Sequence, residues 1–438
     1  MEVPELLAEY AGALVTSDVI NREDLLEAIR QAIHGEGTHI FYIRGDGGIG
    51  KTCLLRAVLR RCQPGGPWHR ERLLAPPPEN LVDLYHTVHH TREGLAHAMR
   101  HSLPTPPGAF TRFDEAYAKW EKEKHDLAGM LRELSNLQER IGEAFVEDLN
   151  GLADQGYRPI LVLDTAERLL YGEDEIQRRL GLEPERTEAL KWLLDILPRL
   201  RNAVVLIAGR PEPARLKEDL QALGAQVWEP GPFGLEETKA YFDAVAERAR
   251  ELGWEEMARQ IASIPDDMRE VIHHYTGGRP ILLALMIDYL LVADALLPRM
   301  KEPVEKVRKR TREELESIRA EVERELVRFW METGREADQA VRALAWAPKG
   351  MDAELLARVL ELRKDGRWDT ETAQAWLDVI RDLSFVKTRP ADGRVFLHDE
   401  MYALFREHVL AGASEEERKR VYGAILQYYE DQILQKRR

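Results

Sequence analysis

The stretch from His39 to Thr52, HIFYIRGDGGIGKT, decides the fold. Its first five residues are mostly apolar or aromatic and predict a short strand. The next part, Gly45 to Thr52, matches the pattern G-x-x-x-x-G-K-[ST], and Lys51 then opens a run with helical periodicity. A strand, a glycine-rich loop and a helix in this order predict a P-loop. In such a loop, backbone N–H groups converge on phosphate oxygens and the helix N-terminus adds positive potential.

The loop predicts a binding site for ATP or ADP with magnesium. Lys51 is expected to neutralise the β- and γ-phosphates and to act in catalysis, and the Thr52 hydroxyl is expected to ligate magnesium. The residues predicted to bind the nucleotide in this loop are Gly47, Gly48, Ile49, Gly50, Lys51, Thr52 and Cys53.

Two further apolar runs are expected to be strands that carry companion residues at their ends. Asp164 ends the run from Pro159 and is predicted to reach the magnesium ion. Glu167 follows one turn later and is the candidate to orient the attacking water, with an outward-facing surface glutamate as the alternative. Arg210 follows the run from Ala203 and is predicted to sense the γ-phosphate, the alternative being a surface arginine.

Alternating strands and helices up to about residue 230 predict an α/β P-loop NTPase domain with a parallel sheet. The sequence after this point shows almost only helical patterns, so we expect an all-α helical domain over 231–330. Two short strands around Pro390-Ala391-Asp392-Gly393 resemble the wing of a winged-helix domain, expected over 331–410. Residues 411–438 are expected to begin a C-terminal helical arm.

Composition restricts the function classes. Only two cysteines, Cys53 and Cys62, rule out a disulfide framework and fit a reducing cytoplasm. The most apolar stretch, Ile281 to Leu297, contains Asp288 and Asp294 and is shorter than the roughly 20 residues that span a bilayer. A formal charge of −15 opposes generic binding to nucleic acid or anionic membrane, although it leaves room for a local basic patch. We therefore expect a cytoplasmic protein and expect neither membrane nor nucleic acid as a partner.

Taken together, the motifs resemble those of STAND ATPases, a class of signal-transduction ATPases that includes plant disease-resistance proteins, animal NOD-like receptors, the apoptosome scaffold and the bacterial maltose regulator. The resemblance covers roughly residues 16–410. It implies four further residues that contact the nucleotide, in addition to the candidate site residues named above. Ile20 and Arg22, in Ile20-Asn21-Arg22-Glu23-Asp24, would lie at the adenine side. Pro280, in Gly277-Gly278-Arg279-Pro280, would pack on the base, and His398 would reach the β-phosphate of ADP.

The resemblance implies a switch: ADP holds a closed, inactive form, and ATP exchange permits opening and self-association, with slow hydrolysis resetting the chain. Sensor and effector modules would then be supplied in cis or in trans. Many relatives carry paired acids where this chain has Glu167-Arg168, which puts fast hydrolysis in doubt. From the residues alone, Pro280 could simply start a helix and His398 could be a partly buried histidine at a strand end.

Two other functions stay open. A DNA-associated AAA-like ATPase would use the winged helix to hold DNA, although acids outnumber bases from Met331 to Leu410. A nucleotide-dependent scaffold would bind without hydrolysing. A GTPase is disfavoured because the sequence contains no Asn-Lys-x-Asp motif for reading guanine.

Overall fold

The computed structural model divides the chain into two compact units, Val19–Gly231 and a second that includes Pro232–Arg438, which are treated separately below. The stretch from Pro4 to Leu14, whose sequence predicts a short helix, lies outside the residues that the structure describes, as does Ile20. The described residues are 22–124, 131–171, 185–211, 214–293, 296–332, 336–348, 350–381, 385–388, 392–397 and 399–436.

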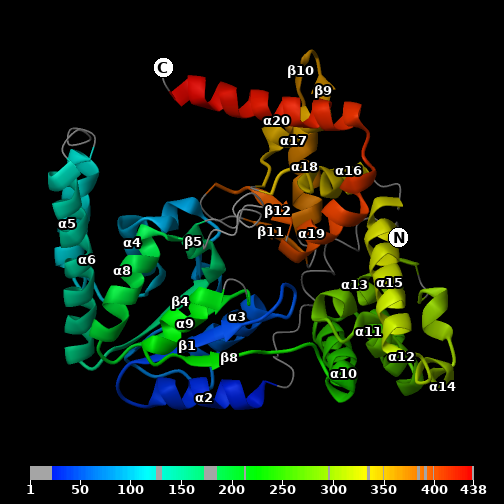
Figure 1. Ribbon diagram of the computed structural model, residues 1–438, viewed down its shortest axis with the longest axis horizontal. Coiled ribbons are helices and arrows are strands. Elements are labelled where there is room, and N and C mark those ends of the chain that lie inside the picture. The colour runs from blue at the N-terminus through cyan, green and yellow to red at the C-terminus, as the bar shows by residue number, and fades with distance from the viewer. Residues whose placement is uncertain are drawn as a thin grey trace. The chain divides into compact units, whose positions relative to one another are not determined.

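The first unit is built on a parallel sheet with the order β2-β4-β7-β1-β8, and β3 also pairs with β4 (Figure 1). Strand β7 pairs with the P-loop strand β1 on one side and with β4 on the other, over Ile160–Leu163. The strands are β1 (His39–Arg44), β2 (Leu73–Leu74), β3 (Val82–Asp83), β4 (Arg158–Asp164), β7 (Val204–Gly209) and β8 (Gln226–Trp228).

Helices cover both faces of this sheet. Neighbouring side chains on each strand point to opposite sides, so each strand contributes to two cores. Phe41 and Ile43 join a core formed with α2 and α3, whereas Ile40 and Tyr42 join the opposite core with α4, α6 and α8. The predicted α/β P-loop fold class is therefore confirmed. The helices are α2 (Glu23–His34), α3 (Lys51–Cys62), α4 (Arg92–Ser102), α5 (Thr111–Glu123), α6 (Leu131–Asp154), α8 (Glu188–Ile196) and α9 (Ala214–Ala222).

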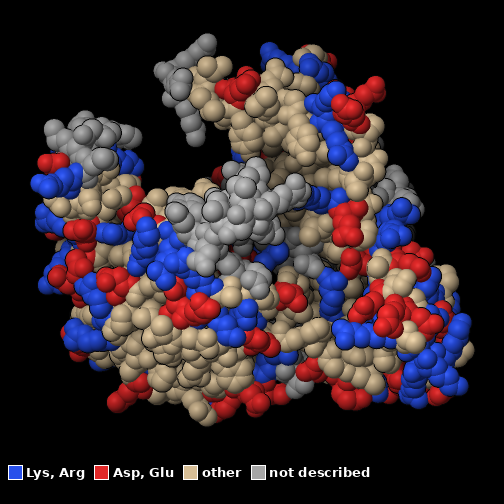
Figure 2. Space-filling view, in the orientation of Figure 1, with Lys and Arg blue, Asp and Glu red and all other residues tan. Residues whose placement is uncertain are grey.

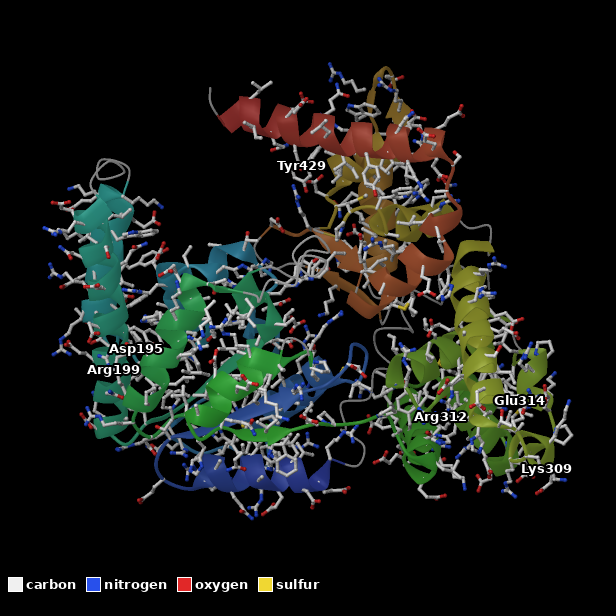
Figure 3. The ribbon with its side chains drawn as sticks, in the orientation of Figure 1. Asp195, Arg199, Lys309, Arg312, Glu314 and Tyr429 are labelled. Carbon is white, nitrogen blue, oxygen red and sulfur yellow. The ribbon has the colours of Figure 1, made fainter. Side chains whose placement is uncertain are left out.

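Short elements fill the connections. The Pro- and Gly-rich segment Gln63 to Asn80, expected to be irregular throughout, contains β2 at the sheet edge, because Leu73 and Leu74 hydrogen-bond with the start of β4. At the end of α8, Arg199 Nη1 lies 3.1 Å from Asp195 Oδ2 (Figure 3). The other short elements are η1 (Pro78–Asn80), η2 (Thr87–His90), η3 (Ala166–Leu169), η4 (Leu197–Arg199), β5 (Leu170–Tyr171) and β6 (Glu185–Arg186).

Two arginines fasten the C-terminal turn of α2. The buried Arg158 guanidinium donates to the carbonyl oxygen of Ala32 and to Asn202 Oδ1, and Arg70 Nη2 donates to the carbonyl oxygen of Ile33 at 2.7 Å. Burial lowers the pKa of Arg158 to about 10, so the group stays charged at neutral pH. A cation at a helix C-terminus is favourable because the last carbonyls are unpaired and carry partial negative charge.

The second unit is mostly helical in its first half, and its described residues share one hydrophobic core that runs from Phe242 to Tyr428. The charge-dense stretch between Arg299 and Phe329 lies mainly on α15. Over the face shown in Figure 2, acidic and basic side chains are interspersed. The helices are α10 (Leu235–Glu251), α11 (Glu255–Ala262), α12 (Asp266–Thr276), α13 (Pro280–Ala293), η5 (Pro298–Lys301), α14 (Val304–Val307) and α15 (Arg312–Glu332).

A winged-helix arrangement follows. Met351 bridges Val395 in antiparallel fashion, and β11 pairs with β12, which gives the order helix, bridge, two helices and two strands. Pro390 and Ala391 lie outside the described residues. The elements are α16 (Glu336–Leu344), α17 (Ala353–Val359), β9 (Arg363–Lys364), β10 (Arg367–Trp368), α18 (Thr370–Arg381), β11 (Val386–Thr388), β12 (Val395–Leu397), α19 (Asp399–His408), η6 (Leu410–Gly412) and α20 (Glu415–Lys436).

The last helix, α20, packs on the winged-helix part. Arg394 donates to the hydroxyls of Tyr428 at 2.9 Å and Tyr429 at 2.8 Å, and Tyr429 is seen on α20 in Figure 3. Arg358 adds a hydrogen bond to Asp431 at 2.7 Å. Among the described residues, no helix is long and apolar enough to cross a membrane.

Candidate nucleotide-binding site

The P-loop connects β1 to α3 and is fixed at its start by the neighbouring strand, since the Gly45 N–H donates to the carbonyl oxygen of Gly209 at 3.1 Å. Gly50, the cap of α3, has φ of 93°, a left-handed backbone that side chains with a Cβ rarely adopt. Ile49 is buried, which holds the middle of the loop against the body of the unit. The loop backbone is thus shaped by its glycines and one buried anchor.

The Lys51 ammonium lies inside the loop. Its Nζ donates to the carbonyl oxygen of Gly45 at 2.6 Å and to that of Asp46 at 2.8 Å. Burial lowers the pKa of Lys51, while the Glu167 and Asp164 carboxylates oppose that shift. A partly buried cation beside a glycine-rich loop suits phosphate oxygens, because in this structure its direct hydrogen bonds go to backbone carbonyl oxygens.

The two residues predicted to hold magnesium, Thr52 and Asp164, are hydrogen-bonded to each other. Thr52 Oγ1 donates to Asp164 Oδ2 at 2.6 Å, although 112 positions separate the two residues in the chain. Magnesium prefers oxygen ligands and is usually bound by one or two protein groups together with phosphates and water. A hydroxyl and a carboxylate oxygen at the carboxyl edge of the sheet therefore fit this ion.

Glu167 and Arg210 also meet each other. The Arg210 N–H donates to Glu167 Oε2 at 3.0 Å, and Arg210 Nε lies 3.5 Å from Oε1. Burial raises the pKa of Glu167, whereas the hydrogen bonds from backbone N–H groups and the Arg210 charge oppose that rise. The Glu167 carboxyl group is buried at the end of β7. Glu167 is therefore not the outward-facing surface glutamate of the alternative interpretation. Its predicted role toward water stays a prediction.

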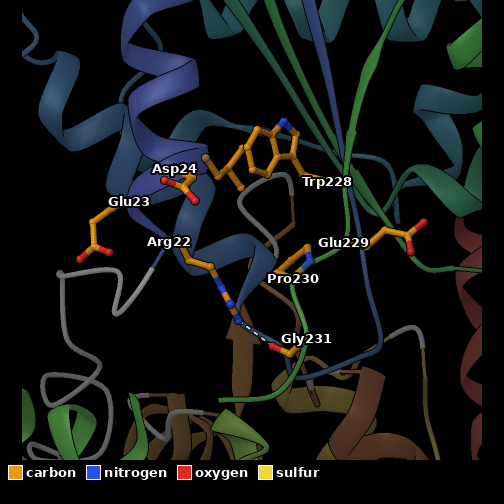
Figure 4. A pocket seen from close by; sticks show the side chains of 8 residues that line it. Arg22, Glu23, Asp24, Trp228, Glu229, Pro230 and Gly231 are labelled. Carbon is orange, nitrogen blue, oxygen red and sulfur yellow. Dashed lines mark hydrogen bonds between the residues drawn. The ribbon is translucent and has the colours of Figure 1, made fainter. Parts of the chain in front are cut away.

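A pocket of about 320 Å³ lies beside the loop. Its lining comes from two places, the N-terminal end of α2 with Arg22 before it, and the last residue of β8 with the segment that follows (Figure 4). Arg22 Nη2 donates to the carbonyl oxygen of Gly231 at 2.6 Å and ties these two segments together. A Cβ at Gly45 would come within 3.2 Å of the Pro230 carbonyl oxygen, so the pocket wall adjoins the first residue of the loop. The lining residues are Arg22, Glu23, Asp24, Leu25, Trp228, Glu229, Pro230 and Gly231.

Some residues near the site are not indicated by the sequence. Trp228 and Pro230 were not singled out, because nothing local relates them to Arg22, which lies about 200 positions away. Asp83 was also not singled out as a residue near the site, because the strand that it ends has only two residues. The signal that could have identified it is an acidic residue at the end of a strand.

Three predicted contacts are not tested by this geometry. Pro280 is the first residue of α13 in the second unit, and its contact with the base stays a prediction. His398 and Ile20 lie outside the described residues. Cys53, in the first turn of α3, is exposed.

A parallel sheet with the P-loop after β1, Asp164 at the end of β4 and β7 between them is the arrangement of a P-loop nucleotide-binding fold. No family model matches the chain, and no curated protein matches it. Solved structures with similarity include the Orc1 protein of Aeropyrum pernix in complex with DNA, at 16% identity and a TM-score of 0.38, covering 91% of this chain and 97% of that one. Another is the Drosophila ORC bound to DNA, at 14% identity and 0.38, covering 91% and 96%.

These comparisons correct one expectation. From the net charge of −15 we did not expect nucleic acid as a partner, but both solved structures are complexes with DNA, so that expectation is corrected: the net charge does not exclude nucleic acid. The physical reason for the error is that net charge averages over the whole surface, whereas binding depends on the charges at one local patch. The comparisons do not single out the STAND class.

Proposed function

We propose that this chain is a magnesium-dependent ATPase. The observation that carries the proposal is the hydrogen bond from the Thr52 hydroxyl to the Asp164 carboxylate, next to Lys51 in the loop. This arrangement places two oxygen ligands and one cation at the end of a glycine-rich loop, as phosphoryl transfer requires. The pocket with Arg22 and Trp228 would take the base, since it adjoins the loop and offers an aromatic ring and polar groups.

In this mechanism the loop N–H groups and Lys51 bind and orient the phosphates. Thr52 and Asp164 would hold magnesium, which when bound would neutralise charge on the phosphate oxygens. Glu167 is the group that would take a proton from the attacking water, because its carboxyl group lies at the end of β7 beside Arg210, and burial raises its pKa. Arg210 would contribute positive charge at the same strand end.

Glu167→Gln is the experiment that separates an ATPase from a scaffold that only binds. Glutamine keeps an acceptor for the Arg210 N–H but cannot take up a proton at neutral pH. We expect single-turnover hydrolysis to fall about 100-fold, in the range typical of a lost general base, while ATP affinity stays unchanged. Phosphate release and fluorescent-nucleotide titration measure the two. Equal hydrolysis by the variant and the wild type would favour the scaffold.

We also propose that the ATPase holds nucleic acid through its winged-helix part. The supporting observation is a basic hairpin, defined as Arg363–Trp368, inserted between the second and third helices of that part. Asp365 and Gly366 form its two-residue turn with φ of 51° and 78°, a type I′ geometry. Its three cations, Arg363, Lys364 and Arg367, are all exposed. The following helix, α18, exposes Glu371 and Asp378, so phosphate contacts are assigned to the hairpin.

Salt-dependent binding of duplex DNA, measured by fluorescence anisotropy, tests this assignment. Replacing Arg363, Lys364 and Arg367 by alanine should weaken binding at least tenfold and reduce the salt slope by about 2 to 3, because each phosphate contact contributes about 0.9. The matched control replaces Lys119, Lys122 and Lys191, exposed cations of the first unit. If the wild type shows no salt-dependent binding, the DNA assignment fails and the ATPase assignment is unaffected.

A nucleotide-controlled switch is the second candidate function. It is favoured by the contact between Glu167 and Arg210, because a carboxylate engaged by a backbone N–H at 3.0 Å must be released before it can act, which slows turnover. ADP that copurifies at near-stoichiometric occupancy would support the switch, with Pro280 and His398 as the predicted closing contacts. An empty site with rapid multiple turnover would argue against it.

A further inference from the structure

A chain of hydrogen bonds runs from the short strand β3 to the P-loop helix. Asp83 Oδ1 accepts from the Thr165 hydroxyl at 2.9 Å. The Thr165 N–H donates to Asp164 Oδ1 at 2.9 Å, and Asp164 Oδ2 accepts from the Thr52 hydroxyl at 2.6 Å. Both oxygens of the Asp164 carboxylate are therefore fixed, one by Thr165 and the other by the residue expected to share magnesium with it.

Thr165 adopts an unfavourable backbone conformation at its place in this series of hydrogen bonds. Its φ is 63°, in the left-handed region, which a β-branched residue adopts only at a cost of roughly 1–3 kcal/mol. Such a conformation persists only where surrounding contacts impose it. Two contacts do so here: the hydroxyl bond to Asp83, and the bond from the Arg168 N–H to the Thr165 carbonyl oxygen at 3.1 Å, at the start of η3.

Asp83 is itself rigidly held. Strand β3 pairs in parallel with β4 so that Asp83 is the register partner of Asp164. The Leu84 N–H donates to the Asp164 carbonyl oxygen at 2.9 Å, and the Tyr85 N–H donates to Asp83 Oδ1 at 2.9 Å. A ring nitrogen of His89 lies 2.8 Å from the Asp83 carbonyl oxygen. The position of Asp83 is thus set by the sheet on one side and by the η2 turn on the other.

We propose that Asp83 is a positioning residue for magnesium binding: through Thr165 it holds the Asp164 carboxylate in the orientation that meets Thr52. This inference rests on the proposed ATPase function and assigns a role to an acid that the loop motif does not include. Asp83 acts through hydrogen bonding and not through its charge. Its loss should therefore weaken the binding of the metal without altering the contacts that the loop makes with phosphates.

The test measures metal affinity directly. Binding of Mn²⁺ to the chain saturated with ADP is followed by the electron paramagnetic resonance of free Mn²⁺, and fluorescent ADP is titrated separately in EDTA. We expect Asp83→Ala and Thr165→Ala to raise the Mn²⁺ dissociation constant about tenfold, with metal-free ADP affinity unchanged. Asp83→Asn and Thr165→Ser keep the hydrogen-bonding atoms and should remain within about twofold of wild type.

A double-mutant cycle completes the test. If Asp83 acts only through Asp164, the pair Asp83→Ala and Asp164→Ala should weaken Mn²⁺ binding no more than Asp164→Ala alone. Additive effects would overturn the proposal, as would an Asp83→Asn variant that loses as much metal affinity as Asp83→Ala. A loss of ADP binding in EDTA would show that Asp83 merely supports the fold. A wild-type chain that binds neither ADP nor Mn²⁺ would instead contradict the proposed function itself.

Discussion

Replacing Lys51 by methionine is expected to reduce ATP hydrolysis at least 100-fold and to weaken ATP binding. Methionine has a similar length but no charge, so the phosphates lose the one cation that the loop itself supplies. Loss of a single preorganised electrostatic group in a water-poor site typically costs about 2.7–4 kcal/mol in the transition state. Phosphate release at saturating ATP and fluorescent-ATP titration measure the two effects.

Two variants make the Lys51 result interpretable. Lys191→Met is the matched control, since Lys191 lies on α8 of the same unit, is 58% exposed and forms an ion pair with the exposed Glu188. Lys51→Arg keeps the charge but replaces a compact ammonium by a planar fork, which should not fit between the Gly45 and Asp46 carbonyl oxygens. Wild-type hydrolysis by Lys51→Met in a folded chain would place the phosphates elsewhere.

Asp164→Asn should produce the second large effect, a shift in the requirement for magnesium. Asparagine keeps the shape of the side chain and an oxygen that can accept from Thr52, but it removes the negative charge that attracts a divalent cation. We expect the magnesium concentration for half-maximal hydrolysis to rise roughly 10- to 100-fold, the range seen when the groups around a metal are lost. Hydrolysis measured across a magnesium titration gives this value.

Thr52 provides the controls for the metal site. Thr52→Ser retains the hydroxyl and should keep the wild-type requirement, whereas Thr52→Val keeps the branched shape without the oxygen and should shift the requirement as Asp164→Asn does. A Thr52→Val variant with an unchanged magnesium requirement would mean that the hydroxyl donates to Asp164 only as a structural contact.

Much of the nucleotide site is predictable because its signals are local. The P-loop was predicted from fixed residue types over eight positions, and the position of Asp164 at the carboxyl end of a buried strand was predicted from the apolar run before it. The winged-helix strands were expected from two short runs, but their third partner was not, because a single bridge at Met351 leaves no periodic pattern. The basic hairpin was overlooked for a similar reason: its cations occur among acids in the sequence, and two strands of two residues each leave no periodic pattern.

The sequence by itself determined that a glycine-rich loop joins a strand to a helix, since backbone freedom at Gly50 and the charge of Lys51 are properties of those residues alone. Only the tertiary structure decided what surrounds the loop. Strand order places β7 between β1 and β4 and brings Arg210 to Glu167. Register places Asp83 beside Asp164, and folding joins Arg22 to Gly231 across 209 positions. These pairings depend on how the whole sheet is assembled, which no local pattern encodes.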